Sequence, residues 1–112
     1  MTFDRWDIVI ALFPFTEIAV RKPRPVLVLS DASFNLDHGH LIGAMITTGA
    51  RSQWPSDHPI ADLSTAGLGS ASIVRWKLFT LPLSVIARRI GRLGGDDRAR
   101  LMLQASHILP SR

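Results

Sequence analysis

Arg24 and Thr47 are two residues whose chemistry and predicted positions belong together. Arg24 stands just before a short apolar strand predicted at residues 26–30, and Thr47 lies near the end of another predicted at 41–48. Suppose that these strands are antiparallel neighbours and that Ser30, before the connecting loop, faces Leu41, after it. The same register then places Arg24 opposite Thr47. Directly opposed residues have Cβ atoms about 4.5–5.5 Å apart. A guanidinium, which binds phosphate through a bidentate fork, would then converge with a hydroxyl at one edge of the sheet, whereas a slip of one residue would separate them.

A second basic pair is predicted on the strand 70–78. Alternation along a strand places Ile73, Arg75 and Lys77 on one face. Arg75 and Lys77 would stand roughly 6.5–7 Å apart, which resembles the spacing of successive phosphates in an extended single strand. A solvated polar face explains the same pattern without a ligand, so both interpretations stay open.

Two loop aromatics, Phe15 and Trp54, are candidates for stacking on unpaired bases. Aromatic side chains in loops also pack onto the body of a domain, and the sequence does not distinguish the two. Lys22 and Thr48, the neighbours of the predicted Arg24–Thr47 pair, are further candidate nucleic-acid contacts.

The composition describes one folded domain, residues 1–112, with an arginine-rich charge. The formal net charge is +4, and 11 of the 13 basic residues are arginine, whose planar fork suits phosphate better than lysine does. The absence of cysteine excludes disulfides and thiolate metal sites. His38 and His40 flank Gly39 in a stretch rich in turn formers and are interpreted as loop residues. No metal and no cofactor are expected.

The N-terminal segment and the apolar runs point to a cytoplasmic location without a membrane partner. Asp4 and Asp7 occupy positions where a secretory signal would carry positive charge. The longest apolar run, residues 8–15, is interrupted by Pro14 and falls far short of the roughly 18 residues that a membrane helix needs.

The predicted elements that must position these residues are short strands with frequent turns, followed by one helix. A barrel is predicted over about 7–93 and the helix over about 96–109, giving a mainly β fold with a C-terminal helix. The strands are expected at 7–13, 26–30, 41–48, 58–61, 70–78 and 87–93, the polar loops at 31–40 and 49–57, and a helical turn at 83–86. Helical spacing predicts one apolar stripe, made of Leu101, Met102, Ala105, Ile108 and Leu109, with Leu103 on the opposite side as a subunit contact.

Seven short motifs occur in an order that resembles the PemK/MazF family of type II toxin–antitoxin toxins from about residue 7 to 109. They are DIV at 7–9 with FPFT at 13–16, KPRPVLVLS at 22–30, AMITT at 44–48, AGL at 66–68, SIVR at 72–75 and RIGRL at 89–93. Each motif alone is common, and their order and spacing carry the resemblance.

The resemblance implies an SH3-like β-barrel of the CcdB/Kid/MazF type that works as a homodimer. Such dimers are mRNA interferases: they cut single-stranded RNA without a metal and are silenced by an antitoxin that lays an acidic segment across the RNA site. Carried over by position, the catalytic residues are Arg24, Thr47 and Arg75.

The sequence departs from some members of that family, which carry an aspartate two residues after the last of these arginines. Lys77 stands at that position here, so the general base stays open. Glu17, the only glutamate, lies in the loop before Arg24 and is one candidate. Two alternatives also stay open: a CcdB-like barrel that binds a protein target such as gyrase, and a nucleic-acid-binding module without catalysis.

Overall fold

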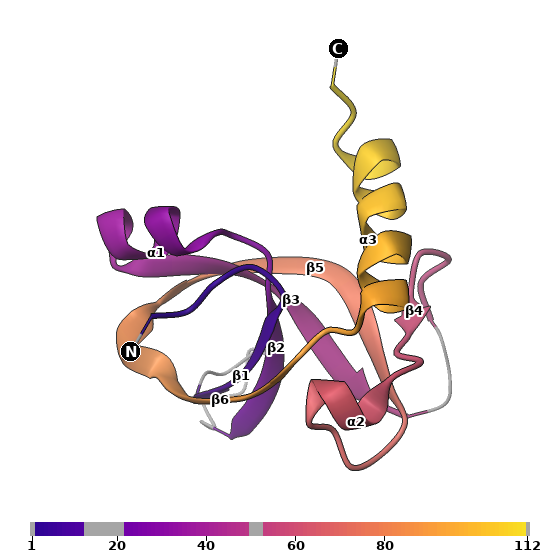
Figure 1. The fold of residues 1–112 in the computed structure, drawn as a ribbon, viewed down its shortest axis with the longest axis horizontal. Coiled ribbons are helices and arrows are strands. Elements are labelled where there is room, and N and C mark those ends of the chain that lie inside the picture. The colour runs from indigo at the N-terminus through magenta and orange to yellow at the C-terminus, as the bar shows by residue number, and fades with distance from the viewer. Residues whose placement is uncertain (1, 13–21, 50–52, 112) are drawn as a thin grey trace.

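The computed structural model describes residues 2–12, 22–49 and 53–111, which form a strongly curved sheet with helices at its ends (Figure 1). Within these residues six strands pair antiparallel in the order β4-β5-β3-β2-β1-β6. The strands are β1 Asp7–Leu12, β2 Pro23–Val28, β3 His40–Thr48, β4 His58–Pro59, β5 Ser72–Pro82 and β6 Ile86–Arg92. The helical elements are α1 Ala32–His38, α2 Leu63–Ala66, the 3-10 turn η1 Leu83–Val85 and α3 Gly95–Ile108. The mainly β fold with a C-terminal helix is confirmed.

The predicted polar loop at 31–40 is wrong, because this segment contains helix α1. The Asp31 carboxylate caps the helix by accepting a hydrogen bond from the Phe34 N–H at 3.0 Å. Gly39 ends it in the left-handed conformation at φ 62°, which glycine adopts without steric cost. Both capping signals are present in the sequence, but the helix is only seven residues long and lacks an apolar period long enough to predict it.

Strand β2 begins three residues before its predicted start and includes two prolines. Pro23 and Pro25 pair with β1 residues Leu12 and Ile10, while the ladder to β3 begins only at Val26. A proline lacks the N–H that a strand with two neighbours must donate. The part of β2 that holds the prolines therefore pairs with β1 alone.

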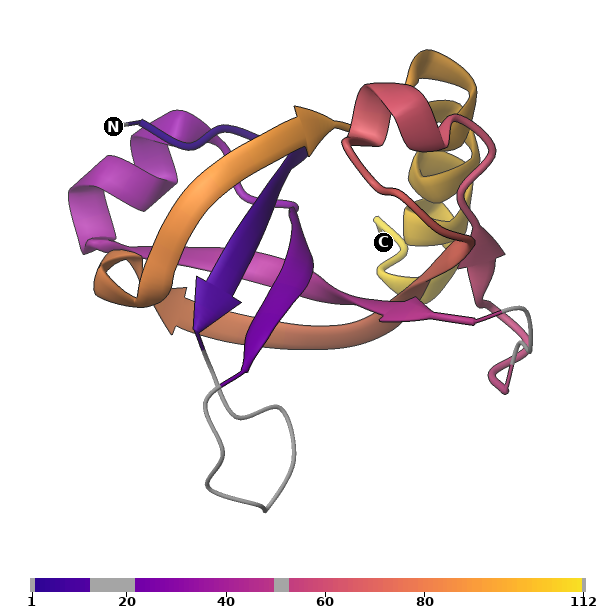
Figure 2. The ribbon, with the colours of Figure 1, turned by 90° about the horizontal axis from the view of Figure 1, so that it is seen from below.

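The interior contains two apolar clusters along the curved sheet. One surrounds Ile8, Leu27 and Val74 and reaches Leu101 of α3, and the other surrounds Val26 and Leu81. Figure 2 shows the long strand β5 extending from the α3 end of the molecule to the α1 end, with β1 and β2 held between β5 and β6.

Helix α3 confirms its predicted bounds but not its predicted buried stripe. Leu101 is fully buried, whereas Met102 is 54% exposed and Leu109 is 68% exposed. The side of α3 that meets the sheet carries Leu101 and Gln104, which accepts a hydrogen bond from Trp76 Nε1 of β5, whereas Met102 lies on another side and the end of the helix projects beyond the sheet (Figure 1). Leu103 is also exposed within this single chain, at 54%.

Helix α2 lies so close to β6 that their backbones touch at two glycines. A Cβ on Gly91 would overlap the backbone of Ala66, and a Cβ on Gly67 would overlap the backbone of Ile90. No helix among the described residues is long and apolar enough to cross a membrane.

Candidate functional site

The register between β2 and β3 is the one that the sequence predicted. Val26 pairs with Met45 and Val28 with Gly43, and the same register, if continued, would oppose Arg24 and Thr47 two residues beyond the end of this ladder. The ladder stops at Val26 because Pro25 has no N–H to donate. Arg24 instead pairs on its other side with Ala11 of β1.

Arg24, Thr47 and Arg75 lie on one face of three adjacent strands. In the β3–β5 ladder Met45 pairs with Arg75 and Thr47 with Ile73, and residues that oppose each other in a ladder point to the same face. Thr47 is two residues from Met45 on β3 and therefore shares that face with Arg75. Arg24 and Thr47 are half-buried, at the rim where the apolar interior gives way to solvent.

The solvated polar face predicted for Arg75 and Lys77 is wrong for Arg75, which is buried. Met45 pairs with Arg75 and Ala44 with Leu78, so β5 has two extra residues, Trp76 and Lys77, which form a β-bulge directly after Arg75. Arg75 is buried and retains 8% of its surface. Lys77 is exposed, with its Nζ 6.0 Å from the centroid of the Phe79 ring.

Asp57 holds the Arg75 guanidinium through two hydrogen bonds. Arg75 Nε donates to Asp57 Oδ1 at 3.0 Å and Nη2 donates to Oδ2 at 2.9 Å. Oδ2 also accepts hydrogen bonds from the backbone N–H groups of Gln53 at 2.9 Å and Trp54 at 3.0 Å. The Arg75 hydrogen bond, helped by these N–H groups, holds the pKa of Asp57 well below its ordinary value despite burial. The same hydrogen bond raises the pKa of Arg75.

Trp54 lies against the guanidinium that Asp57 holds. The Arg75 Cζ is 5.4 Å from the centroid of the Trp54 ring, within the range of a cation–π contact. The turn closes through the Asp57 N–H, which donates to the Trp54 carbonyl at 3.0 Å. Trp54 remains 39% exposed, so its ring is held by the protein and still reaches solvent.

The family model for PemK-like, MazF-like toxins of type II toxin–antitoxin systems matches residues 4–109. The chain belongs to this family. No curated protein sequence is significantly similar to the toxin.

Solved structures of MazF proteins have the same fold. A Mycobacterium tuberculosis toxin, MazF-mt6, has 25% identity and a TM-score of 0.71, covering 90% of this chain and 93% of its own. A MazE–MazF structure from Deinococcus radiodurans has 22% identity and a TM-score of 0.78, with both chains fully covered. An endoribonuclease in complex with its cognate antitoxin from a mycobacterial species has 13% identity and a TM-score of 0.73, covering 98% of this toxin and 99% of its own chain.

Of the predicted contact residues not yet placed, the structure describes Lys22 and Thr48. Lys22 is exposed directly before β2. Thr48 is exposed at the end of β3, on the opposite face from Thr47. Phe15 and Glu17 lie outside the described residues.

Asp57 is the site residue that the sequence did not reveal. It lies 18 positions before Arg75 and at the end of a turn, where an aspartate is ordinary turn chemistry. Its pairing with Arg75 follows from the placement of β4 beside β5, because the register His58↔Val74 brings the preceding residue, Asp57, opposite Arg75.

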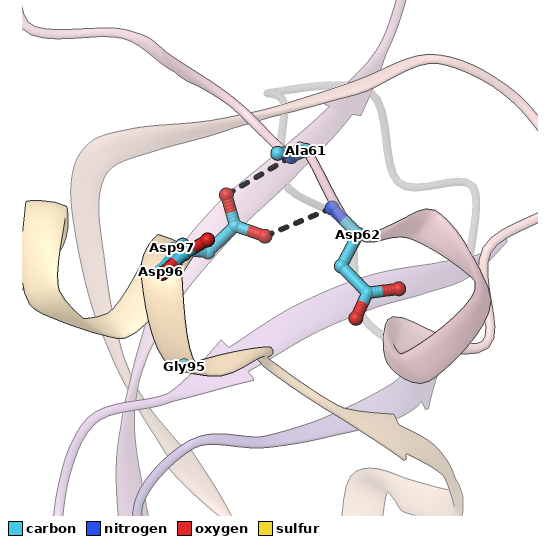
Figure 3. A pocket seen from close by; sticks show the side chains of 5 residues that line it. All are labelled: Ala61, Asp62, Gly95, Asp96 and Asp97. Carbon is cyan, nitrogen blue, oxygen red and sulfur yellow. Dashed lines mark hydrogen bonds between the residues drawn. The ribbon is translucent and has the colours of Figure 1, made fainter.

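An acidic pocket at the start of α3 has a structural role (Figure 3). Asp97 is buried and accepts hydrogen bonds from the backbone N–H groups of Ala61 at 2.9 Å and Asp62 at 3.1 Å and from His58 Nε2 at 2.7 Å. Burial opposes ionisation of Asp97, but these hydrogen bonds outweigh it and lower its pKa. Asp97 thus fastens α3 to the segment after β4. Asp62 and Asp96 also line this pocket, and their negative charge disfavours a phosphate there.

The two histidines that flank Gly39 act locally. His40 Nδ1 lies 2.8 Å from the His38 carbonyl oxygen, and the His38 ring contacts Phe34 with centroids 4.5 Å apart. Within the described parts of the chain, no group of three or more metal-ligating side chains is placed to hold an ion.

Proposed function

We propose that this toxin is a sequence-specific endoribonuclease that cleaves single-stranded mRNA without a metal, by attack of a ribose 2′-hydroxyl on the adjacent phosphate. The observation that carries this proposal is the placement of Arg24, Thr47 and Arg75 on one face of β2, β3 and β5. The family shown by residues 4–109 and the endoribonuclease with the same fold support it.

The three residues suit the charge that builds on the phosphate during this reaction. As the 2′-oxygen approaches phosphorus, negative charge grows on the phosphoryl oxygens, and fixed arginines stabilise it with little reorganisation. Arg24 serves this role, and the Thr47 hydroxyl across from it donates a hydrogen bond to a phosphoryl oxygen. The P–O5′ bond breaks, which leaves a 2′,3′-cyclic phosphate and a 5′-oxygen that takes a proton from solvent to become the 5′-hydroxyl.

The base that accepts the 2′-hydroxyl proton is not part of the Arg75–Asp57 ion pair. Asp57 is unsuited, because guanidinium and backbone donors occupy both of its oxygens and keep its pKa low. We retain Glu17, at the start of the segment that leads to Arg24, as the proposed base.

We also propose that the toxin acts as a cytoplasmic homodimer controlled by a cognate antitoxin. The exposed apolar side chains on the outer half of α3, Met102, Leu103 and Leu109, provide a surface for a subunit contact. MazE–MazF structures of the same fold and the antitoxin-bound endoribonuclease support an antitoxin as partner.

Incubation of the purified toxin with a single-stranded RNA in EDTA tests the activity. We expect cleavage at a preferred sequence with a 2′,3′-cyclic phosphate on the upstream product. Binding without cleavage would point to a nucleic-acid-binding module, and neither binding nor cleavage would point to a protein target. Cleavage that requires added divalent metal would contradict the metal-independent mechanism.

A further inference from the structure

We propose that Trp54, Asp57 and Arg75 form a nucleotide subsite, in which Arg75 binds an RNA phosphate, Trp54 stacks on the neighbouring base and Asp57 positions both. This inference deepens the proposed ribonuclease function and rests on it. Asp57 is a positioning residue here, since it acts through Arg75 and Trp54 and does not itself touch the RNA.

One edge of the Arg75 guanidinium donates hydrogen bonds to Asp57, and another edge can bind a ligand. Nε and Nη2 donate to the two Asp57 oxygens. Nη1 makes no hydrogen bond within the described part of the chain and is not fully buried. Its two N–H groups can therefore reach a phosphate oxygen while the Asp57 pair stays intact.

The Trp54 turn is tied to the same carboxylate that holds Arg75. Asp57 Oδ2 accepts hydrogen bonds from the N–H groups of Gln53 and Trp54 and from Arg75 Nη2. One carboxylate thus fixes the backbone that carries the indole and the side chain that carries the charge. An asparagine at this position would turn an amide N–H₂ towards some of these donors and lose part of the set.

The indole has one part against the guanidinium and another exposed to solvent. Its ring centroid is 5.4 Å from Arg75 Cζ, and 39% of the residue is exposed. A base that stacks on the exposed ring and a phosphate at Nη1 belong to one nucleotide or to two neighbours. Stacking of this kind tolerates any base, so the subsite contributes binding and orientation more than base choice.

The ionisation of Asp57 agrees with a positioning role. The Arg75 hydrogen bond lowers its pKa, so the carboxylate stays charged at every pH where RNA cleavage is measured. Arg75 retains only 10% of its side-chain surface, so the guanidinium is held before RNA arrives.

The test is binding of an uncleavable RNA in which each position in turn lacks its base. The probe is a fluorescein-labelled oligonucleotide that contains the mapped cleavage site, or oligouridine if no cleavage is found, with 2′-O-methyl groups throughout. Fluorescence anisotropy gives Kd for the full-length toxin and for Trp54→Ala, Trp54→Phe and Asp57→Asn. Asp37→Asn is the matched control, since Asp37 is an exposed aspartate on α1 at the opposite end of the molecule from β4 (Figures 1 and 2).

We expect one abasic position to weaken binding by about tenfold, as loss of a stacked base does. Trp54→Ala should cause the same loss and abolish sensitivity at that position, while Trp54→Phe should restore most of the affinity. Asp57→Asn should reproduce the loss of positional sensitivity and Asp37→Asn should not.

The proposal is overturned if the parent toxin is equally sensitive at all positions, or if Trp54→Ala leaves the sensitive position unchanged. It is also overturned if Asp57→Asn lowers the melting temperature while retaining full positional sensitivity, because that is the behaviour of a purely structural ion pair. Absence of RNA cleavage with the abasic pattern intact would refute the proposed function alone.

Discussion

Replacement of Arg24 and Thr47, singly and together, gives a quantitative test of the site. The β2–β3 register, continued two residues past its last pair Val26↔Met45, places Arg24 and Thr47 on the same face, and the proposed mechanism has both residues reach the same phosphate. Loss of one donor to developing negative charge costs about 10²–10³ in rate, or about 2.7–4 kcal/mol. We expect a loss of this size for Arg24→Ala and for Thr47→Ala.

The double variant should lose much less than the product of the single losses. Groups that act on one phosphate depend on each other, and contacting residues show coupling of about 0.5–3 kcal/mol. We expect the double variant to exceed the rate predicted from independent effects by at least about fivefold, which corresponds to about 1 kcal/mol. The rate losses of Arg24→Ala and Arg75→Gln should be closer to additive when the two changes are combined. The reason is that Arg75 lies on the next strand, β5, and its guanidinium is held by Asp57.

The assay is single-turnover cleavage of a labelled RNA in EDTA at saturating toxin. Arg88→Ala and Thr80→Ala are matched controls because both residues are exposed on other parts of the sheet, and they should cleave at the parent rate. The variants of Arg24 and Thr47 and the two controls should melt within a few degrees of the parent, because Arg24 and Thr47 are only half-buried. Parent activity in either single variant, or strict additivity in the double variant, would refute the reasoning.

Three further predictions concern the scaffold. Asn35 is buried, and its side chain makes three hydrogen bonds that join α1 to Phe3 and Ser30. At about 1 kcal/mol per hydrogen bond, Asn35→Ala should lower the free energy of unfolding by about 3 kcal/mol. Urea denaturation measures this loss. Gly91→Ala should lower it by about 2–3 kcal/mol, because the new Cβ overlaps the Ala66 backbone. Asp97 has a lowered pKa in the folded state, so its stabilising effect is present above about pH 4 and is lost as the pH falls through the folded value; the difference in melting temperature between the parent and Asp97→Asn should therefore be larger at pH 7 than at pH 3.

Each of these scaffold predictions has a clear contrary outcome. A loss below 1 kcal/mol for Asn35→Ala would mean that water replaces its partners. Unchanged stability of Gly91→Ala would mean that α2 can move away from β6. A melting difference for Asp97→Asn that grows towards pH 3 would contradict the direction of its pKa shift.

The elements that the sequence predicted correctly are those with a strong local signal. The strand at 7–13, the strand at 41–48 and the helix at 96–109 match β1, β3 and α3 closely, because β-rich apolar runs and an acidic first turn are local properties. Helix α1 was missed because its capping residues were present without an apolar period. The predicted apolar stripe of α3 is buried only at Leu101, since periodicity shows which residues share a side of a helix but not which side a neighbour covers.

The sequence by itself determined the register of β2 and β3, in which Val26 pairs with Met45. Two apolar strands of opposite direction around a short connection admit few registers, and a one-residue slip would expose the core side chains. The tertiary structure alone decided the environment of Arg75. Its carboxylate partner Asp57 comes from a turn 18 residues away, and a β-bulge that contains Lys77 follows it directly. Neither can be derived from local pattern, because both depend on which strand lies beside β5 and on where the ladder loses its register.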